Sequence, residues 1–216
     1  MGGLSSWEED YRSVKSLWGL EPDHVLAKYS RLIPRGNVLD LGIGEGRNAL
    51  FFAKMGYEVE GVDISSTAIE RCAERAKNAN LRIKLDVKDL RETDIPEGRY
   101  SLIIAAWVLN FFKRIEIEEI VKDVKNGLKG GGFFYTGVLS VEDPGYESAK
   151  KDLPLLEENT FFSEKRGLCM HYFTKDEILS LVSDFKIIHC SEGRELDLSH
   201  GEPHYHGFIE IMGQKR

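Results

Sequence analysis

The sequence has little of what marks secreted, membrane-spanning or nucleic-acid-binding proteins. Its 216 residues include only three cysteines, Cys72, Cys169 and Cys190, whose spacing suggests no pairing and predicts reduced thiols in a cytoplasmic protein. No apolar run approaches the ~20 residues that cross a bilayer, and the first ten residues lack the pattern of a secretory signal. The formal net charge of −7 argues against nucleic acid as the main partner, because nucleic-acid binders use basic surfaces to neutralise phosphates.

What the chain does contain is an alternation of short apolar strands with helical segments. The strands are predicted at 37–41, 57–62, 81–87, 100–106 and 133–139. The helices between them are predicted at about 46–55, 65–78 and 117–128. Such alternation is typical of α/β proteins, and it predicts a doubly wound, mostly parallel sheet with helices on both faces.

The two ends of the chain add to this pattern. The stretch 140–170 is predicted to be irregular, with prolines and several charges. The connection between the last two strands is too short for a helical crossover, so these strands are predicted to pair antiparallel. The remaining segments are predicted as helices at about 7–17, 22–32 and 174–183 and as strands at 185–191 and about 205–212.

The first predicted strand runs into a glycine turn and then a helix, with the letters DLGIGEG at residues 40–46. Glycines allow a tight turn and let a ligand approach main-chain atoms with no Cβ in the way. The loop lies at the carboxyl end of the strand, where open α/β sheets bind their ligands. We therefore expect a ligand to lie against this backbone.

Carboxylates after three successive strands decide between two kinds of ligand. Residues 44–49 fit the G-x-G-x-x-A spacing of a nicotinamide dinucleotide site, and Asp63 lies near the distance expected for a ribose contact. Asp40, directly before the turn, gains nothing from a pyrophosphate but attracts an ammonium group. Asp89, after the third strand, is placed to accept a hydrogen bond from an adenine amino group. An amine, a ribose and an adenine without phosphate indicate S-adenosylmethionine.

Residues 37–139 resemble the class I S-adenosylmethionine-dependent methyltransferases through the motifs VLDLGIGEGRN, VEGVDIS, LDVKDL and LIIAAWVLNFF. Within that superfamily the run DLGIGEGRNALFFAKMGYEVEGVDIS is similar to the tellurite-resistance methyltransferase branch. A departure is Ile43, where many relatives carry cysteine. The resemblance implies a Rossmann-like, seven-stranded sheet whose last strand is antiparallel, and S-adenosylmethionine as the cofactor.

The resemblance also implies which residues contact the cofactor. Alternatives remain open at three positions, because Asp40 is also placed to cap the turn, Asp63 to cap the following helix, and Asp86 to take the role of Asp89. Arg47, in the first helical turn, faces either the cofactor carboxylate or solvent. The implied contacts are Asp40, Gly42, Gly44 and Gly46 at the methionine portion, Asp63 at the ribose, Ile64, Asp89 and Leu90 at the adenine, and Ala105 at the amino group.

Few features of the sequence indicate the methyl acceptor. The Asn-Pro-Pro-Tyr motif of enzymes that methylate amines of nucleobases and glutamine is absent after the fourth strand. Trp107, Phe111 and Phe112 either wall an acceptor pocket or pack under the sheet edge. We find no defensible acid–base pair, and a soft acceptor such as a thiolate, selenide or telluride needs none. The prediction is methyl transfer to a small-molecule acceptor of unknown identity.

A histidine cluster near the carboxyl terminus has several interpretations. The letters SHGEPHYHGF contain His200, His204 and His206, with Glu202 between them. Side chains two residues apart on a strand share a face, so His204 and His206 are candidates for one metal ion, with His200 or Glu202 as third ligand. No cysteine pattern supports zinc, and the histidines are equally candidates for the acceptor pocket or for the surface. We expect no resident metal.

The opening segment carries the aromatic residues Trp7, Tyr11, Trp18 and Tyr29. They predict either a lid over the cofactor, with Tyr11 reaching its carboxylate, or anchors that hold the helices to the core. A single domain is expected, with a helical lid at 1–35, a cofactor-binding core at 36–139 and an acceptor-side region at 140–216.

Two other functions stay open at this stage. One is a nicotinamide-dependent Rossmann oxidoreductase, and the other is a non-catalytic module that binds S-adenosylmethionine for regulation. The sequence does not indicate the oligomeric state.

Overall fold

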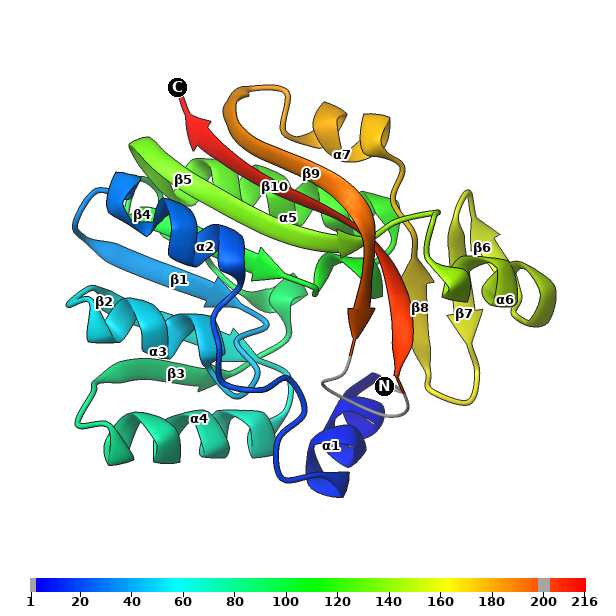
Figure 1. Cartoon of the computed structure of the whole chain (residues 1–216), viewed down its shortest axis with the longest axis horizontal. Coiled ribbons are helices and arrows are strands. Elements are labelled where there is room, and N and C mark those ends of the chain that lie inside the picture. The colour runs from blue at the N-terminus through cyan, green and yellow to red at the C-terminus, as the bar shows by residue number, and fades with distance from the viewer. Residues whose placement is uncertain (1–2, 198–202) are drawn as a thin grey trace.

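The computed structural model describes residues 3–197 and 203–216, arranged around a seven-stranded sheet (Figure 1). The strand order is β3-β2-β1-β4-β5-β10-β9. The β10 strand runs antiparallel to both of its neighbours, and the pairs among β1 to β5 are parallel. The predicted doubly wound sheet with an antiparallel last strand is therefore confirmed. The strands are β1 (Asn37–Leu41), β2 (Glu58–Asp63), β3 (Ile83–Val87), β4 (Tyr100–Ala106), β5 (Leu128–Leu139), β9 (Phe185–Asp197) and β10 (His204–Lys215).

Helices cover both faces of this sheet because its central strands are apolar on both sides. In β4, Leu102 and Ile104 pack against the helices of one face, whereas Ile103 and Ala105 pack against those of the other. This alternation with a period of two makes three layers with a core on either side of the sheet. The first face carries α2 (His24–Tyr29), α3 (Arg47–Lys54) and α4 (Ser66–Asn78), and the second carries α5 (Arg114–Gly127) and α7 (Lys175–Leu181).

Caps fix the helix starts that the sequence indicates. The Ser65 hydroxyl accepts a hydrogen bond from the Ala68 amide at the start of α4 (3.1 Å). The Thr174 hydroxyl does the same for the Glu177 amide at the start of α7 (3.2 Å) and so caps that helix. Short 3₁₀ helices follow three of the other elements: η1 (Ser30–Leu32), η2 (Leu90–Glu92) and η3 (Leu109–Phe111).

The stretch 140–170 is ordered, so the prediction of an irregular segment was wrong. Asp143 caps a helix with Pro144 in its first turn, and its carboxylate accepts a hydrogen bond from the Gly145 amide (2.7 Å). A three-stranded antiparallel sheet follows, and Phe161 and Tyr172 pack with that helix in a small separate core. The elements are too short to show a period in the sequence: α6 (Pro144–Asp152), β6 (Leu155–Glu157), β7 (Thr160–Ser163) and β8 (Leu168–His171).

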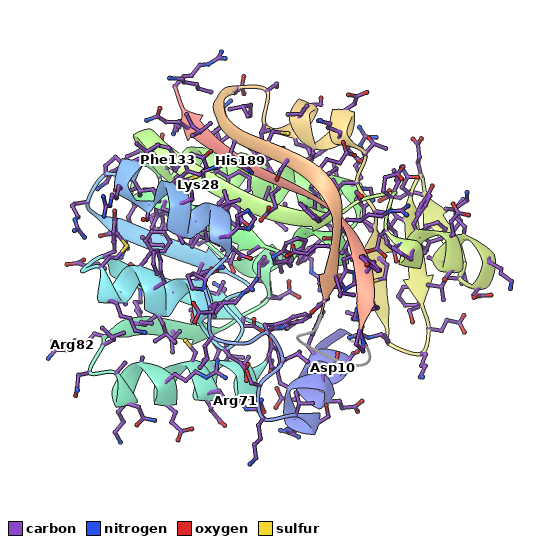
Figure 2. All side chains as sticks on the ribbon, viewed as in Figure 1. Asp10, Lys28, Arg71, Arg82, Phe133 and His189 are labelled. Carbon is purple, nitrogen blue, oxygen red and sulfur yellow. The ribbon has the colours of Figure 1, made fainter. Side chains whose placement is uncertain are left out.

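The first helix, α1 (Gly3–Ser13), begins and ends about four residues before the predicted limits. It lies against α4, beyond the carboxyl ends of β1 and β2, rather than on either face of the sheet (Figure 1). Figure 2 shows Asp10 of α1 and Arg71 of α4 at this same end of the molecule. Within the described residues, no helix is long and apolar enough to cross a membrane.

Candidate cofactor site

The loop between β1 and α3 turns on glycines in the left-handed region. Gly42, Gly44 and Gly46 have φ angles of 72°, 54° and 86°, which a side chain disfavours. The amides of Gly42 and Ile43 both donate to the Val62 carbonyl of β2 (2.9 Å each). The loop is thereby held beside the end of β2.

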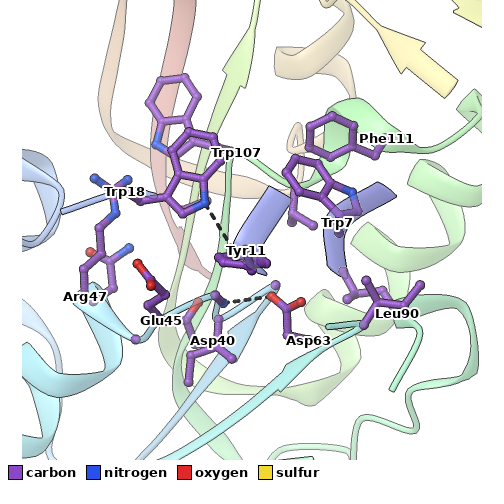
Figure 3. Close-up of a pocket in the computed structure, with 18 of the residues that line it drawn as sticks. Trp7, Tyr11, Trp18, Asp40, Glu45, Arg47, Asp63, Leu90, Trp107 and Phe111 are labelled. Atoms are coloured by element: carbon purple, nitrogen blue, oxygen red, sulfur yellow. Dashed lines mark hydrogen bonds between the residues drawn. The ribbon is translucent and has the colours of Figure 1, made fainter. Parts of the chain in front are cut away.

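A cavity opens over this loop at the carboxyl ends of the parallel strands (Figure 3). The structure brings most of the predicted contacts together there. The residues that were predicted from the sequence and that line the cavity are Tyr11, Asp40, Gly42, Gly44, Gly46, Arg47, Asp63, Ile64, Asp89, Leu90 and Trp107.

Asp63 at the end of β2 is fixed by the backbone on both sides. Its two carboxylate oxygens accept hydrogen bonds from the amides of Gly44 (2.8 Å) and Ser65 (2.9 Å). Burial raises the pKa of Asp63, while these two bonds act in the opposite direction. A carboxylate offers about four acceptor positions, so Asp63 retains capacity for the hydroxyls of a ribose.

Asp40 at the end of β1 is buried among other carboxylates. Burial raises its pKa to about 8, the negative charges of Asp23 and Asp63 add to that rise, and the nearby Arg47 guanidinium opposes it. A buried carboxylate with this surplus of negative neighbours is stabilised by a cationic group in the cavity, and a phosphate there would destabilise it further.

The adenine contact was left open between Asp86 and Asp89. Asp89 lines the cavity, whereas Asp86 is exposed on β3 and is not part of the lining. Arg91 holds the Asp89 carboxylate, with its Nε and the Asp89 Oδ1 at 3.0 Å, and this bond lowers the pKa of Asp89. Ile64 and Leu90 add apolar surface to the same part of the cavity.

Aromatic residues from the amino-terminal segment cover the cavity, as Figure 3 shows. The Tyr11 hydroxyl accepts a hydrogen bond from the Trp18 indole nitrogen (3.1 Å), and Tyr11 is buried. The Trp7 ring meets the Phe111 ring edge-on, with 4.7 Å between centroids. Phe111 and Phe112 both line the cavity, so they do more than pack under the sheet edge. These contacts favour the interpretation of the segment as a lid.

Asp23, which the sequence analysis missed, joins this segment to the glycine loop. Its carboxylate accepts hydrogen bonds from Arg47 Nη2 (2.7 Å), Asn48 Nδ2 (2.7 Å) and the Trp107 indole nitrogen (3.2 Å). The Asp23 amide in turn donates to Asn48 Oδ1 (2.9 Å). Arg47 therefore lines the cavity while paired with a residue of the protein. The position of Asp23 after Pro22 resembles a helix cap, but its side chain makes no cap hydrogen bond.

The sequence analysis also missed Glu45, in the middle of the glycine loop. Its buried carboxylate pairs with Arg71 (3.0 Å) and Arg75 (3.2 Å) of α4 and accepts the Leu17 amide (3.0 Å). It thus connects three segments that are distant in sequence. Nothing in the letters GEG distinguishes such a residue from an exposed loop glutamate.

Several predicted residues lie elsewhere. Ala105 is fully buried and its carbonyl accepts a hydrogen bond from the Thr136 hydroxyl (2.8 Å), so Ala106 lines the cavity in its place. His204 and His206 are not among the described residues that line the cavity, and they lie at the amino-terminal end of β10. Tyr29 packs against His189 (5.6 Å between ring centroids). The candidates His200 and Glu202 lie outside the described residues.

Comparison with known proteins shows what this chain is similar to. Residues 38–132 match a family described as a methyltransferase domain. The probable S-adenosyl-L-methionine-dependent methyltransferase TehB of Haemophilus influenzae is 31% identical over 143 residues, which are 65% of this chain and 49% of TehB. Residues 38–132 are thus identified as a methyltransferase domain, and the predicted resemblance to the class I S-adenosylmethionine-dependent methyltransferases is confirmed. The similarity to TehB also supports S-adenosylmethionine as the cofactor class and places the chain near the TehB-like methyltransferases.

Solved structures share the fold of this chain. The crystal structure of TehB from Haemophilus influenzae matches with a TM-score of 0.71 at 22% identity, over 90% of this chain and 62% of that one. A 1,6-didemethyltoxoflavin-N1-methyltransferase from Burkholderia thailandensis, solved with S-adenosylhomocysteine, matches with a TM-score of 0.73 at 18% identity, over 98% and 86%. The chain spans about half the length of the curated relatives it matches first.

Proposed function

We propose that the protein transfers the methyl group of S-adenosylmethionine to a small-molecule acceptor. The observation that carries the proposal is the cavity over the glycine loop, which three carboxylates line from the ends of β1, β2 and β3. Its two arginines are already engaged by Asp23 and Asp89, so the cavity favours a cationic, phosphate-free nucleoside. A nicotinamide dinucleotide, the alternative enzyme ligand, would place a pyrophosphate beside Asp40.

The residues present fit each part of this cofactor. Asp40 is suited to the ammonium group, because a cation nearby favours the ionised form that burial and the neighbouring carboxylates disfavour. Asp63 is suited to the ribose hydroxyls, and Asp89 to the adenine amino group. The glycine loop offers main-chain atoms to the methionine portion, and Ile64 and Leu90 offer apolar contacts to the adenine ring.

The sulfonium supplies an already activated methyl group, so the protein mainly has to orient the acceptor and exclude water. Trp7, Tyr11 and Trp18 cover the cavity and thereby reduce access of water. Trp107, Phe111 and Phe112 present an aromatic wall beside them, which suits an apolar or polarisable acceptor better than a charged polymer. We place the acceptor against this wall.

Three further expectations belong to the same proposal. The lid is residues 1–35, the cofactor-binding core 36–139 and the acceptor-side region 140–216. A small acceptor agrees with the covered cavity and with the 1,6-didemethyltoxoflavin bound by the similar Burkholderia enzyme. A cytoplasmic location agrees with the three free thiols.

The test is a ligand titration followed by thermal unfolding. S-adenosylhomocysteine is expected to raise the Tm and NAD to leave it unchanged, because only a ligand that binds the native state stabilises it. Asp89→Asn should weaken S-adenosylhomocysteine binding several-fold, and the matched exposed variant Asp86→Asn should not. Stabilisation by NAD alone would refute the proposal.

The acceptor is then sought by measuring S-adenosylhomocysteine release with panels of thiols, selenides, tellurite-derived species and heterocyclic amines. Binding of S-adenosylhomocysteine without turnover of any acceptor, including those in small-molecule cell extracts, would favour the regulatory module over the enzyme.

A further inference from the structure

Side chains of three residues of metal-ligating types meet at the end of the β9–β10 hairpin where β9 ends and β10 begins. The Nε2 atoms of His204 and His206 are 2.9 Å apart, and Asp197 Oδ2 is 3.8 Å from the His206 Nε2. One donor atom from each of the three residues lies within 4.8 Å of the other two. Two imidazoles and a carboxylate are ligands that zinc and similar divalent transition metals favour.

The strand register makes this arrangement a property of the fold. Asp197 pairs directly with His204 across the antiparallel strands, and His206 follows two residues later on the same face of β10. The carboxylate, that of Asp197, therefore comes from β9. The spacing of the histidines along β10 did not reveal this residue. Phe208 continues this face and contacts Trp107, with 6.4 Å between ring centroids, so the cluster lies on the side of β10 that faces Trp107.

A buried carboxylate orients one of the two imidazoles. Asp143 Oδ2 lies 2.8 Å from His206 Nδ1 and also accepts a hydrogen bond from the Gly207 amide (2.9 Å), while Oδ1 accepts the Gly145 amide (2.7 Å). With its oxygens committed as acceptors, Asp143 selects the His206 tautomer that carries its proton on Nδ1. The lone pair of His206 Nε2 then points into the cluster, which is how an outer carboxylate prepares a metal-ligating histidine.

We infer that Asp197, His204 and His206 form a binding site for a divalent transition metal such as Zn²⁺, with Asp143 as the positioning residue behind His206. The inference goes beyond methyl transfer and does not depend on it.

The distances suit such an ion with small adjustments. Tetrahedral zinc with Zn–N bonds of about 2.0–2.1 Å separates two ligand nitrogens by roughly 3.3 Å. The two Nε2 atoms, at 2.9 Å, need to move apart by only a few tenths of an ångström. His206 and Asp197 keep 29% and 20% of their side-chain surfaces exposed, so an ion can enter from solvent and keep a water as its fourth ligand.

The experiment measures metal directly and needs no methyl acceptor. The full chain is loaded with Zn²⁺, dialysed and analysed for zinc by mass spectrometry, and Co²⁺ is substituted to record its ligand-field absorption. One zinc per chain is expected for the wild type and for His24→Ala, a control that removes an exposed histidine outside the cluster. His204→Ala, His206→Ala and Asp197→Asn should each bind zinc at least 10-fold more weakly, with loss of the tetrahedral Co²⁺ spectrum.

Asp143→Asn separates positioning from ligation. It should weaken zinc binding about 10- to 100-fold while leaving a tetrahedral Co²⁺ spectrum at saturating metal, because the ligand atoms remain. Circular dichroism and thermal unfolding report whether each variant is folded. Zinc affinity that is unchanged in the folded His204→Ala and His206→Ala variants, or a wild type that takes up no zinc above the buffer blank, would overturn the inference and leave a hydrogen-bonded histidine pair.

Discussion

The Tyr11 hydroxyl lies so close to Gly44 that a Cβ on this glycine would come within 2.8 Å of it. The first helix and the glycine loop therefore fit together only because the loop has no side chain at this point. The contact connects the residue that covers the cavity with the backbone that forms its floor.

Gly44→Ala should thus both strain the loop and displace the lid. The left-handed backbone alone costs roughly 1–2 kcal/mol with alanine. Gly98→Ala is the matched control, since Gly98 has a φ of 61° against 54° for Gly44, yet a Cβ there meets nothing within 4 Å. Denaturant unfolding should show a larger loss for Gly44→Ala, and calorimetry at least a 10-fold loss of S-adenosylhomocysteine affinity for that variant alone. Equal effects of the two substitutions would contradict a lid that rests on the loop.

Asp40 should make the stability of the ligand-free protein depend on pH. Its folded-state pKa of about 8 is above the ordinary 3.8, so between these values the unfolded chain has released a proton that the folded chain retains. The contribution of Asp40 to stability therefore falls as the pH rises from about 4 to 8. Asp40→Asn lacks this titration.

The measurement is urea unfolding of the wild type and Asp40→Asn across that pH range. The difference in unfolding free energy should move in favour of the variant as the pH rises, and S-adenosylhomocysteine should bind the variant more weakly. Parallel pH profiles would show that Asp40 is not the buried, destabilised carboxylate described above.

Glu8 is expected to hold α1 against the start of α4. Its carboxylate accepts hydrogen bonds from the Ser65 hydroxyl (2.7 Å) and the Thr67 amide (3.2 Å). Burial alone would raise the pKa of Glu8, but the hydrogen bonds from Thr67 and Ser65 lower it to about 2. Because this value is below the ordinary 4.5, the stabilisation is complete above pH 4.5 and is lost as the pH falls towards 2.

Glu8→Gln should remove about 1 kcal/mol of docking free energy, the usual scale of a helix-capping contact. Hydrogen exchange should be faster throughout α1 in this variant, whereas Glu9→Gln, at an exposed position of the same helix, should leave exchange unchanged. Identical exchange in both variants would show that Glu8 does not hold the helix.

Asp23 is predicted to be the most sensitive residue of the connection between the lid segment and the loop. Asp23→Ala removes the acceptor of Arg47, Asn48 and the Trp107 indole at once. Breaking a buried pair typically costs 3–5 kcal/mol, and the partial exposure of Arg47 reduces this to about 2–4 kcal/mol. Glu21→Ala, at an exposed neighbouring position, should change stability by less than about 0.5 kcal/mol. Thermal unfolding of the two variants distinguishes these outcomes.

The elements that could be predicted are those whose signals are local. The β1 strand, the glycine loop and α3 follow one another within eighteen residues, so the apolar run, the glycines and the helix pattern fixed them and placed Asp40 and Asp63 beside the turn. The β4 strand was predicted with its observed limits, 100–106, because a buried parallel strand is apolar throughout. Asp89 could be placed by its position after the third strand and by the family resemblance, which favoured it over Asp86.

The sequence by itself therefore determined the doubly wound sheet, the cofactor loop and the resemblance to methyltransferases. Only the tertiary structure decided how the cavity is closed and where the histidines go, since Asp23, Glu45 and Glu8 act on partners that are 24 to 84 residues away in the chain. Likewise, Asp197 lies beside the histidine pair because of the register between β9 and β10. Asp143 lies beside it because this residue caps the start of α6. Hydrogen bonds and ion pairs depend on the distance between atoms in space, and one sequence records that distance only where the partners are neighbours along the chain.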